Sequence, residues 1–224
     1  MKLERMDEFF AARVDIYDGH MLREVPGCRE GYRQMAAALP EGTDSLLDLG
    51  CGTGLELAEI FQRFPLCKVT AIDLTAAMLE RLRLQYAGRA LTLVCGDYFA
   101  CELGENRYDA AVSFQSLHHF PPDQKRLLYR RICRSLKAGG VYIEGDYMVE
   151  DEAEETFYRL ENERLRHEQG IKEDVFCHYD TPCTVCHQIE LLREAGFAEI
   201  RQLYREENTT LLAAKKGDGR NGGI

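Results

Sequence analysis

The sequence lacks long hydrophobic runs and any excess of basic residues. No stretch of about 18 apolar residues occurs in the chain, and its start, Met1 to Glu8, has no apolar core like that of a signal peptide. Asp and Glu number 38 against 28 Lys and Arg, a net charge of -10. A nucleic-acid backbone or an anionic membrane would need a concentrated basic face. We therefore expect a cytoplasmic protein with neither of these as its main partner.

The sequence also lacks the signs of a disulfide framework and of a second domain. The 9 cysteines are odd in number, and Cys67, Cys95 and Cys133 fall inside predicted strands or helices, so buried thiols are the better interpretation. A chain of 224 residues is long enough for one well-buried α/β domain and short for two. We predict an N-terminal helical segment over 1–40, one domain over 41–216 and a disordered tail over 217–224.

What the sequence does contain is an alternation of apolar and amphipathic segments, which predicts βαβ units and a mostly parallel sheet. Strands are expected at 45–49, 68–73, 90–95, 108–114 and 140–147, with helices at 54–63, 75–86 and 123–136. A helix at 185–195 precedes strands at 197–204 and 209–214, whose short connection permits only an antiparallel hairpin. Two further helices are expected at 5–24 and 28–39.

An acidic segment interrupts this alternation at about 150–180. Its apolar stripe is thin, with Phe157, Leu160 and Leu165, so we expect a helical insertion that is largely solvated. A lid over a substrate is the alternative interpretation of the same segment.

The glycine-rich turn from Asp48 to Gly54, with the sequence DLGCGTG, follows an apolar strand. Glycines there admit backbone conformations closed to other residues and let a ligand approach closely. A dinucleotide fingerprint would need Gly or Ala where Leu55 stands, and a phosphate-binding P-loop would need a lysine near the turn. Asp48 would repel a polyphosphate. The turn therefore favours a ligand that carries an ammonium group.

Two acidic residues follow the next strands. Asp73 ends the second strand and is placed to accept hydrogen bonds from both hydroxyls of a ribose, or to cap the helix that starts near Thr75. Asp97 follows the third strand, where it is either a turn residue or the acceptor for an adenine amine, with Tyr98 or Leu74 on the ring face. Ammonium, ribose and adenine together describe S-adenosylmethionine.

These motifs resemble those of the class I S-adenosylmethionine-dependent methyltransferases of the small, freestanding kind. The resemblance covers roughly residues 40 to 216 and rests on five motifs in the family's order: LDLGCGTG at 47–54, AIDL at 71–74, GD at 96–97, YDAAVSF at 108–114 and LKAGG at 136–140. It implies a doubly wound, Rossmann-like α/β fold with a seven-stranded sheet, mostly parallel with an antiparallel last strand. It also implies that residues 1–40 form a helical lid, with Phe9, Phe10 and Tyr17 over the cofactor; packing on the sheet is the alternative.

We expect S-adenosylmethionine to be held by the glycine turn, the strand ends, the loop after the fourth strand and the lid. The predicted binding residues are Tyr17, Asp48, Gly50, Cys51, Gly52, Gly54, Asp73, Leu74, Met78, Gly96, Asp97, Tyr98 and Gln115.

Methyl transfer from a sulfonium mainly requires alignment of the acceptor and exclusion of water, with a base only where the acceptor is protonated. The predicted catalytic residues are His119, Asp146, Tyr147 and His187. The segment Cys177 to His187 holds two cysteines at x-x spacing and nearby histidines. This segment either binds a metal ion or is a loop that enters the next helix, and the absence of a second distant pair favours the loop. No metal is therefore predicted.

The sequence thus predicts an enzyme that moves the cofactor's methyl group to a small-molecule acceptor and releases S-adenosylhomocysteine. A protein or RNA substrate, a non-catalytic cofactor-binding or metal or redox sensor, and an enzyme that uses the cofactor for different chemistry stay as alternatives. A nicotinamide oxidoreductase is disfavoured by Leu55. The sequence does not indicate the accepting atom or the oligomeric state.

Overall fold

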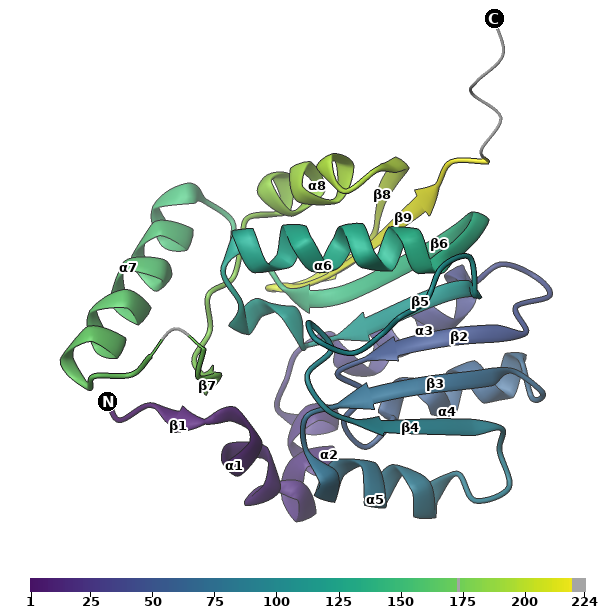
Figure 1. The fold of residues 1–224 in the computed structure, drawn as a ribbon, viewed down its shortest axis with the longest axis horizontal. Coiled ribbons are helices and arrows are strands. Elements are labelled where there is room, and N and C mark those ends of the chain that lie inside the picture. Colours follow the sequence, from purple (N-terminus) through teal and green to yellow (C-terminus); the bar gives the residue numbers. More distant parts are fainter. Residues whose placement is uncertain (173, 219–224) are drawn as a thin grey trace, which may run out of the picture.

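The central sheet has seven strands in the order β4-β3-β2-β5-β6-β9-β8 (Figure 1). Their bounds are β2 (Ser45–Leu49), β3 (Lys68–Asp73), β4 (Leu91–Cys95), β5 (Tyr108–Phe114), β6 (Leu136–Tyr147), β8 (Phe197–Glu206) and β9 (Thr209–Lys216). The computed structural model describes residues 1–172 and 174–218. The first five strands pair in parallel, whereas β9 is antiparallel to both β6 and β8. This confirms the predicted mostly parallel sheet with an antiparallel last strand.

Helices cover both faces of this sheet because apolar side chains project from each face of its central strands. On one face, α3 (Cys28–Ala38), α4 (Leu55–Arg63) and α5 (Ala76–Gln85) bury side chains such as Met35 and Ile60. On the other face, α6 (Pro122–Ser135) and α8 (Val185–Glu194) bury Tyr129 and Leu191 (Figure 1). The doubly wound fold is therefore confirmed, and it brings the carboxyl ends of the parallel strands to one edge.

The N-terminal segment differs from the single helix expected at 5–24. The structure has a short strand β1 (Glu4–Arg5), then α1 (Met6–Ala11) and α2 (Val14–Arg23). β1 pairs antiparallel with β7 (Cys177–His178), and the backbone N–H of Met6 donates to the carbonyl of Phe176 at 3.0 Å. Arg13, with φ -114° and ψ 5°, lies outside regular helix and separates α1 from α2. The short strand β1 comes from pairing with a distant segment, which periodicity does not register.

The strand β6 begins at Leu136, earlier than the predicted residue 140. Its pairing with β5 shifts register between Tyr108 and Ala110, and Gly139 has a φ of 71°. A glycine in the left-handed region lets the chain make this irregularity and still pair on both sides of it. The LKAGG motif is therefore the start of the strand.

The acidic insertion forms α7 (Glu152–Glu168), which begins where the Asp151 side chain accepts a hydrogen bond from the N–H of Glu154. It lies beyond the carboxyl ends of the parallel strands, apart from the helices that cover the sheet (Figure 1). Phe157 and Leu160 are exposed and Leu165 is buried. The helix is thus largely solvated, as expected.

The disordered tail predicted at 217–224 falls mostly outside the described residues. Within the described part of the chain, no helix combines the length and the apolar character needed to cross a membrane.

Candidate active site

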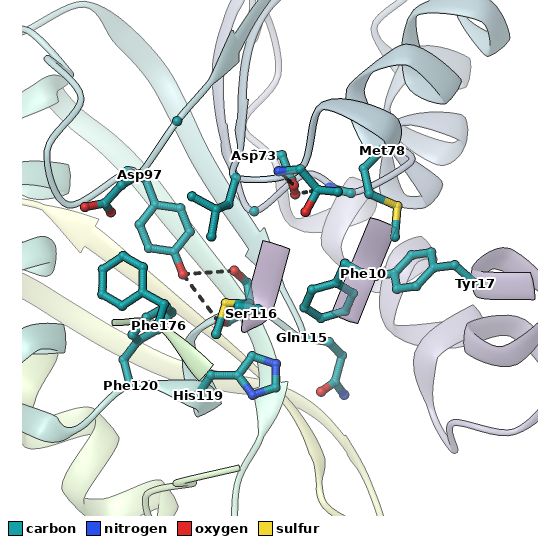
Figure 2. Close-up of a pocket in the computed structure, with 17 residues that line it drawn as sticks. Phe10, Tyr17, Asp73, Met78, Asp97, Gln115, Ser116, His119, Phe120 and Phe176 are labelled. Atoms are coloured by element: carbon teal, nitrogen blue, oxygen red, sulfur yellow. Dashed lines mark hydrogen bonds between the residues drawn. The ribbon is translucent and has the colours of Figure 1, made fainter. Parts of the chain in front are cut away.

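A pocket opens at the carboxyl ends of β2, β3, β4 and β5, and it gathers most of the predicted cofactor-binding residues (Figure 2). The predicted residues that line it are Tyr17, Gly50, Gly52, Asp73, Leu74, Met78, Gly96, Asp97, Tyr98 and Gln115. The predicted catalytic residue His119 lines it as well. We call this the cofactor pocket.

The glycine turn presents bare backbone to the pocket. Gly50 has a φ of 69°, and a Cβ atom there would lie 2.0 Å from Oγ of Ser116. Gly52 has a φ of 49°, and a Cβ atom there would point at the ring of Tyr17 at 3.4–3.6 Å. Both positions have left-handed backbone, and at Gly50 a Cβ atom would also collide with Ser116. Glycine is therefore required by the local geometry as well as by the approach of a ligand.

Asp73 links the turn to the next helix while it faces the pocket. Its Oδ2 accepts from the N–H of Gly52 at 2.9 Å, and its Oδ1 accepts from the N–H of Thr75 at 2.8 Å. Burial raises the pKa of Asp73, and these two hydrogen bonds oppose that effect. The capping interpretation and the ribose interpretation are compatible, because each carboxylate oxygen has a second lone pair for a hydroxyl.

The far wall of the pocket is aromatic. Asp97 accepts from the N–H of Phe99 at 2.7 Å, and Tyr98 shares a hydrogen bond with Ser116 at 3.2 Å. Phe120 and Phe176 lie beside them, with ring centroids 5.3 Å apart (Figure 2). Such a wall suits the flat faces of an adenine.

Sequence reasoning missed some residues of this lining, namely Met6, Thr75 and Phe176. Thr75 follows the predicted ribose-binding Asp73 closely, so its position carried a signal. Met6 and Phe176 meet only through the pairing of β1 with β7, for which the sequence holds no local signal.

Asp48, Cys51 and Gly54 do not line the pocket. Asp48 is only 1% exposed, and neither of its carboxylate oxygens has a hydrogen-bond partner among the described residues. Burial, together with the charge of the nearby Glu56, holds the pKa of Asp48 well above its usual range. Cys51 is buried, and Gly54 packs against Leu82 where α4 begins. The structure therefore buries Asp48 beneath the turn, and its contact with a ligand stays a prediction.

A second cavity of about 530 Å³ adjoins the cofactor pocket. The two share Phe10, Tyr17, Gln115 and His119 as a common wall, and Figure 2 shows these four side chains converging. We call the second cavity the acceptor cavity. Its lining also includes the predicted catalytic residue Tyr147, whose hydroxyl lies 3.2 Å from that of Tyr158 on α7.

Histidines and carboxylates gather at the inner end of the acceptor cavity. His118 Nδ1 lies 2.5 Å from Asp146 Oδ1, and Asp146 also accepts from the N–H groups of Leu117 and Tyr147. Burial opposes the charge on His118, but the Asp146 carboxylate outweighs it and raises the pKa of His118. Asp180 Oδ1 lies 3.5 Å from His118 Nε2 and 3.2 Å from His119 Nδ1. The predicted catalytic residue Asp146 thus faces His118 and does not line either cavity.

His178 completes this group of side chains. Its ring stacks on Phe9 with centroids 3.6 Å apart, and it lies 4.8 Å from the ring of His119. Burial, with the charge of His119, lowers the pKa of His178 to about 4. His178 is therefore a neutral side chain at pH 7.

The remaining predicted catalytic residue, His187, lies elsewhere. Its Nδ1 is 2.5 Å from Glu155 Oε1, at the junction of α7 and α8, and it lines neither cavity. Glu155 Oε2 also accepts from the N–H of Thr184. Cys183 is buried against the ammonium group of Lys125, whereas Cys186 is exposed. The structure thus separates the two cysteines of the x-x pair and joins Glu155, Cys183 and His187 into one cluster.

Comparison with known proteins identifies the domain that holds the glycine turn. A family model described as "Methyltransferase domain" matches residues 46–140, the segment that supplies the glycine turn, Asp73 and Asp97. This segment is a methyltransferase domain, and the chain has the fold of class I S-adenosylmethionine-dependent methyltransferases. S-adenosylmethionine is the cofactor of this family, and the cofactor pocket fits it through bare glycine backbone, a strand-end carboxylate and an aromatic wall.

Individual relatives extend this result. An uncharacterized methyltransferase of Mycobacterium tuberculosis is 39% identical over 104 residues, which are 46% of this chain and 51% of that protein. The alignment therefore spans about half of each chain. A carboxy-S-adenosyl-L-methionine synthase of Wolinella succinogenes is 27% identical over 97% of this chain and 96% of its own length. Human N-acetylserotonin methyltransferase, solved with its cofactor, shares the fold at a TM-score of 0.63 and 20% identity, over 94% of this chain and 55% of that chain.

Proposed function

We propose that this methyltransferase moves the methyl group of S-adenosylmethionine to a small molecule held in the acceptor cavity. The observation that carries the proposal is the common wall of Phe10, Tyr17, Gln115 and His119 between the two cavities. A methyl group held at that wall would face an acceptor on its other side. In-line displacement from a sulfonium requires this alignment and the exclusion of water.

The residues of the chain have separate roles in this proposal. Asp73 would bind the ribose hydroxyls, and Asp97 the exocyclic amine of the adenine. Phe10 and Tyr17, from α1 and α2, would close the site against water. Bound S-adenosylmethionine would supply the electrophilic methyl group. The acceptor cavity, at about 530 Å³, has the size of a small-molecule site, which suits a metabolite better than a folded macromolecule.

A second candidate function follows from the comparisons. The Wolinella relative aligns end to end with this chain, and its name describes a synthase of carboxy-S-adenosyl-L-methionine. An enzyme of that kind would add a carboxyl group to the cofactor. Among the described residues, however, no Lys or Arg lines the cofactor pocket, and the one guanidinium group that lines the acceptor cavity, that of Arg13, is already paired with Glu4. This observation favours methyl transfer.

Isotope tracing tests the proposal. The protein would be incubated with S-adenosylmethionine labelled in its methyl group, together with a small-metabolite extract, a protein fraction or an RNA fraction. Label in a small molecule, with an equal amount of S-adenosylhomocysteine, is the expected result. Label in protein or RNA would refute the small-molecule acceptor. Mass spectra showing a carboxylated cofactor without S-adenosylhomocysteine would establish the second candidate instead.

A further inference from the structure

Three side chains from two distant segments meet at the inner end of the acceptor cavity. His118 and His119 follow β5, and Asp180 follows β7. Each offers one ligand atom, and these atoms all lie within 4.8 Å of one another. We propose that His118, His119 and Asp180 form a binding site for a divalent transition-metal ion that holds the methyl acceptor.

The distances between the ligand atoms agree with such a site. Asp180 Oδ1 lies 3.5 Å from His118 Nε2 and 3.2 Å from His119 Nδ1. Bonds of about 2.0–2.2 Å to nitrogen and oxygen around a tetrahedral zinc ion place neighbouring ligand atoms roughly 3.3 Å apart. An ion can therefore enter between Asp180 and either histidine with little movement of these side chains.

Asp146 supplies the support that a metal-binding histidine needs. It contacts Nδ1 of His118 at 2.5 Å, which leaves Nε2 turned toward Asp180. Asp146 is itself buried and held by the N–H groups of Leu117 and Tyr147. A carboxylate on the far nitrogen of a metal-binding histidine is the usual way to fix the orientation of its ring. Asp146 would then be a positioning residue.

The site is open on one side. His118, His119 and Asp180 all line the acceptor cavity, and the side chain of Asp180 is 37% exposed. Two imidazoles and one carboxylate leave at least one coordination position for a ligand from that cavity. The methyl acceptor would then be a small molecule that binds the ion through a carboxylate or an ionisable hydroxyl group. In the second case the ion would help to remove the proton of the hydroxyl. This identification of the acceptor rests on the proposed function, whereas metal binding does not.

The cluster of Glu155, Cys183 and His187 is the natural control, because it offers the same number of ligand atoms. Its groups are engaged elsewhere. Glu155 holds the N–H of Thr184 at the start of α8. Cys183 accepts from the buried ammonium group of Lys125, whose positive charge opposes a nearby cation. This cluster is therefore not expected to bind the ion.

Cobalt titration tests the site. The full chain, prepared without a histidine tag and stripped by a chelator, would be titrated with Co²⁺. We expect ligand-field absorption in the visible range that saturates at one ion per chain and is lost when Zn²⁺ is added. Asp180→Asn should weaken Co²⁺ binding at least tenfold, and His187→Gln should leave it unchanged. Thermal melts without metal would show that each variant is folded, and His119→Gln provides a second ligand variant.

The outcomes separate the possibilities. No stoichiometric Co²⁺ on the unaltered protein, or equal binding by Asp180→Asn, would overturn the proposal and leave Asp180 as an ion-pair partner of the two histidines. Loss of binding in His187→Gln alone would also overturn it by moving the site to the α7–α8 junction. Calorimetry of S-adenosylhomocysteine on the same samples keeps the proposed function separate, because its binding does not require the metal.

Discussion

At the scale of single residues, Asp73 shows how one carboxylate can shape a site and also serve it. It fixes the glycine turn through Gly52 and the start of α5 through Thr75. We expect Asp73→Ala to weaken S-adenosylhomocysteine binding by about 1–3 kcal/mol, because ribose hydroxyls would lose their acceptor. Isothermal calorimetry measures this change. Asp123→Ala, an exposed carboxylate on α6, is the matched control, and equal affinities of the two variants would contradict the assignment.

Glu144 provides a test of pH dependence away from the cavities. It is buried, accepts from Tyr129 and Gln188, and burial together with the charge of Asp146 raises its pKa to about 8 from 4.5. A raised carboxyl pKa stabilises the fold below about pH 4.5, and this contribution is lost as the pH rises through about 8. Glu144→Gln cannot ionise. The free energy of unfolding of Glu144→Gln, relative to that of the unaltered protein, should therefore increase between about pH 4.5 and about pH 8, by up to about 1.4 kcal/mol per pH unit.

Urea unfolding of both proteins at a series of pH values from 5 to about 9 measures this difference. A difference in the free energy of unfolding that stays constant with pH would show that Glu144 is ionised in the folded protein.

At the scale of elements, a partly buried hydrogen bond helps to hold α2 over the glycine turn. Thr53 Oγ donates to Asp18 Oδ1 at 2.6 Å, and Asp18 Oδ2 pairs with Arg81 on α5 at 3.1 Å. We expect Thr53→Val, which keeps the shape and removes the hydroxyl, to loosen α2 at a cost of about 1 kcal/mol. S-adenosylhomocysteine affinity should fall roughly fivefold, and trypsin should cleave faster at Arg13 and Arg23.

Thr92→Val, on the exposed surface of β4, is the control for this substitution. If limited proteolysis shows the same rate for both variants and the unaltered protein, α2 is held by other contacts.

The predictability of the elements also differs along the chain. The strands and helices between Ser45 and Ser135 were predicted within a residue or two, because each buries a periodic apolar face in a local βαβ unit. The N-terminal break and the early start of β6 were not predicted. In the N-terminal region the strand at Glu4–Arg5 depends on pairing with Cys177 and His178, and the early start of β6 depends on left-handed backbone at Gly139. Both are decided by contacts or conformations that side-chain periodicity does not encode.

At the scale of the whole molecule, the same distinction separates the two cavities. The cofactor pocket was largely predictable, because its motifs sit at successive strand ends that any parallel sheet brings together. The acceptor cavity was not, since it unites α2 with the loops after β5 and β7. The proximity of Asp180 to His118 could not be predicted from sequence spacing. Nor does the sequence pattern indicate that the strand buries the side chain of Asp48 beneath the turn.

The short pairing of β1 with β7 joins two segments that lie far apart in the sequence, with Glu4 opposite His178. Holding these segments together costs chain entropy, which is offset by the small buried cluster of Leu3, Leu165 and Cys177 and by Met6 in the main core. Segments held so lightly are the first to open in local unfolding. The β1–β7 pairing should therefore open at lower denaturant concentrations than the sheet. The residence time of a bound cofactor would then depend on how often this pairing opens.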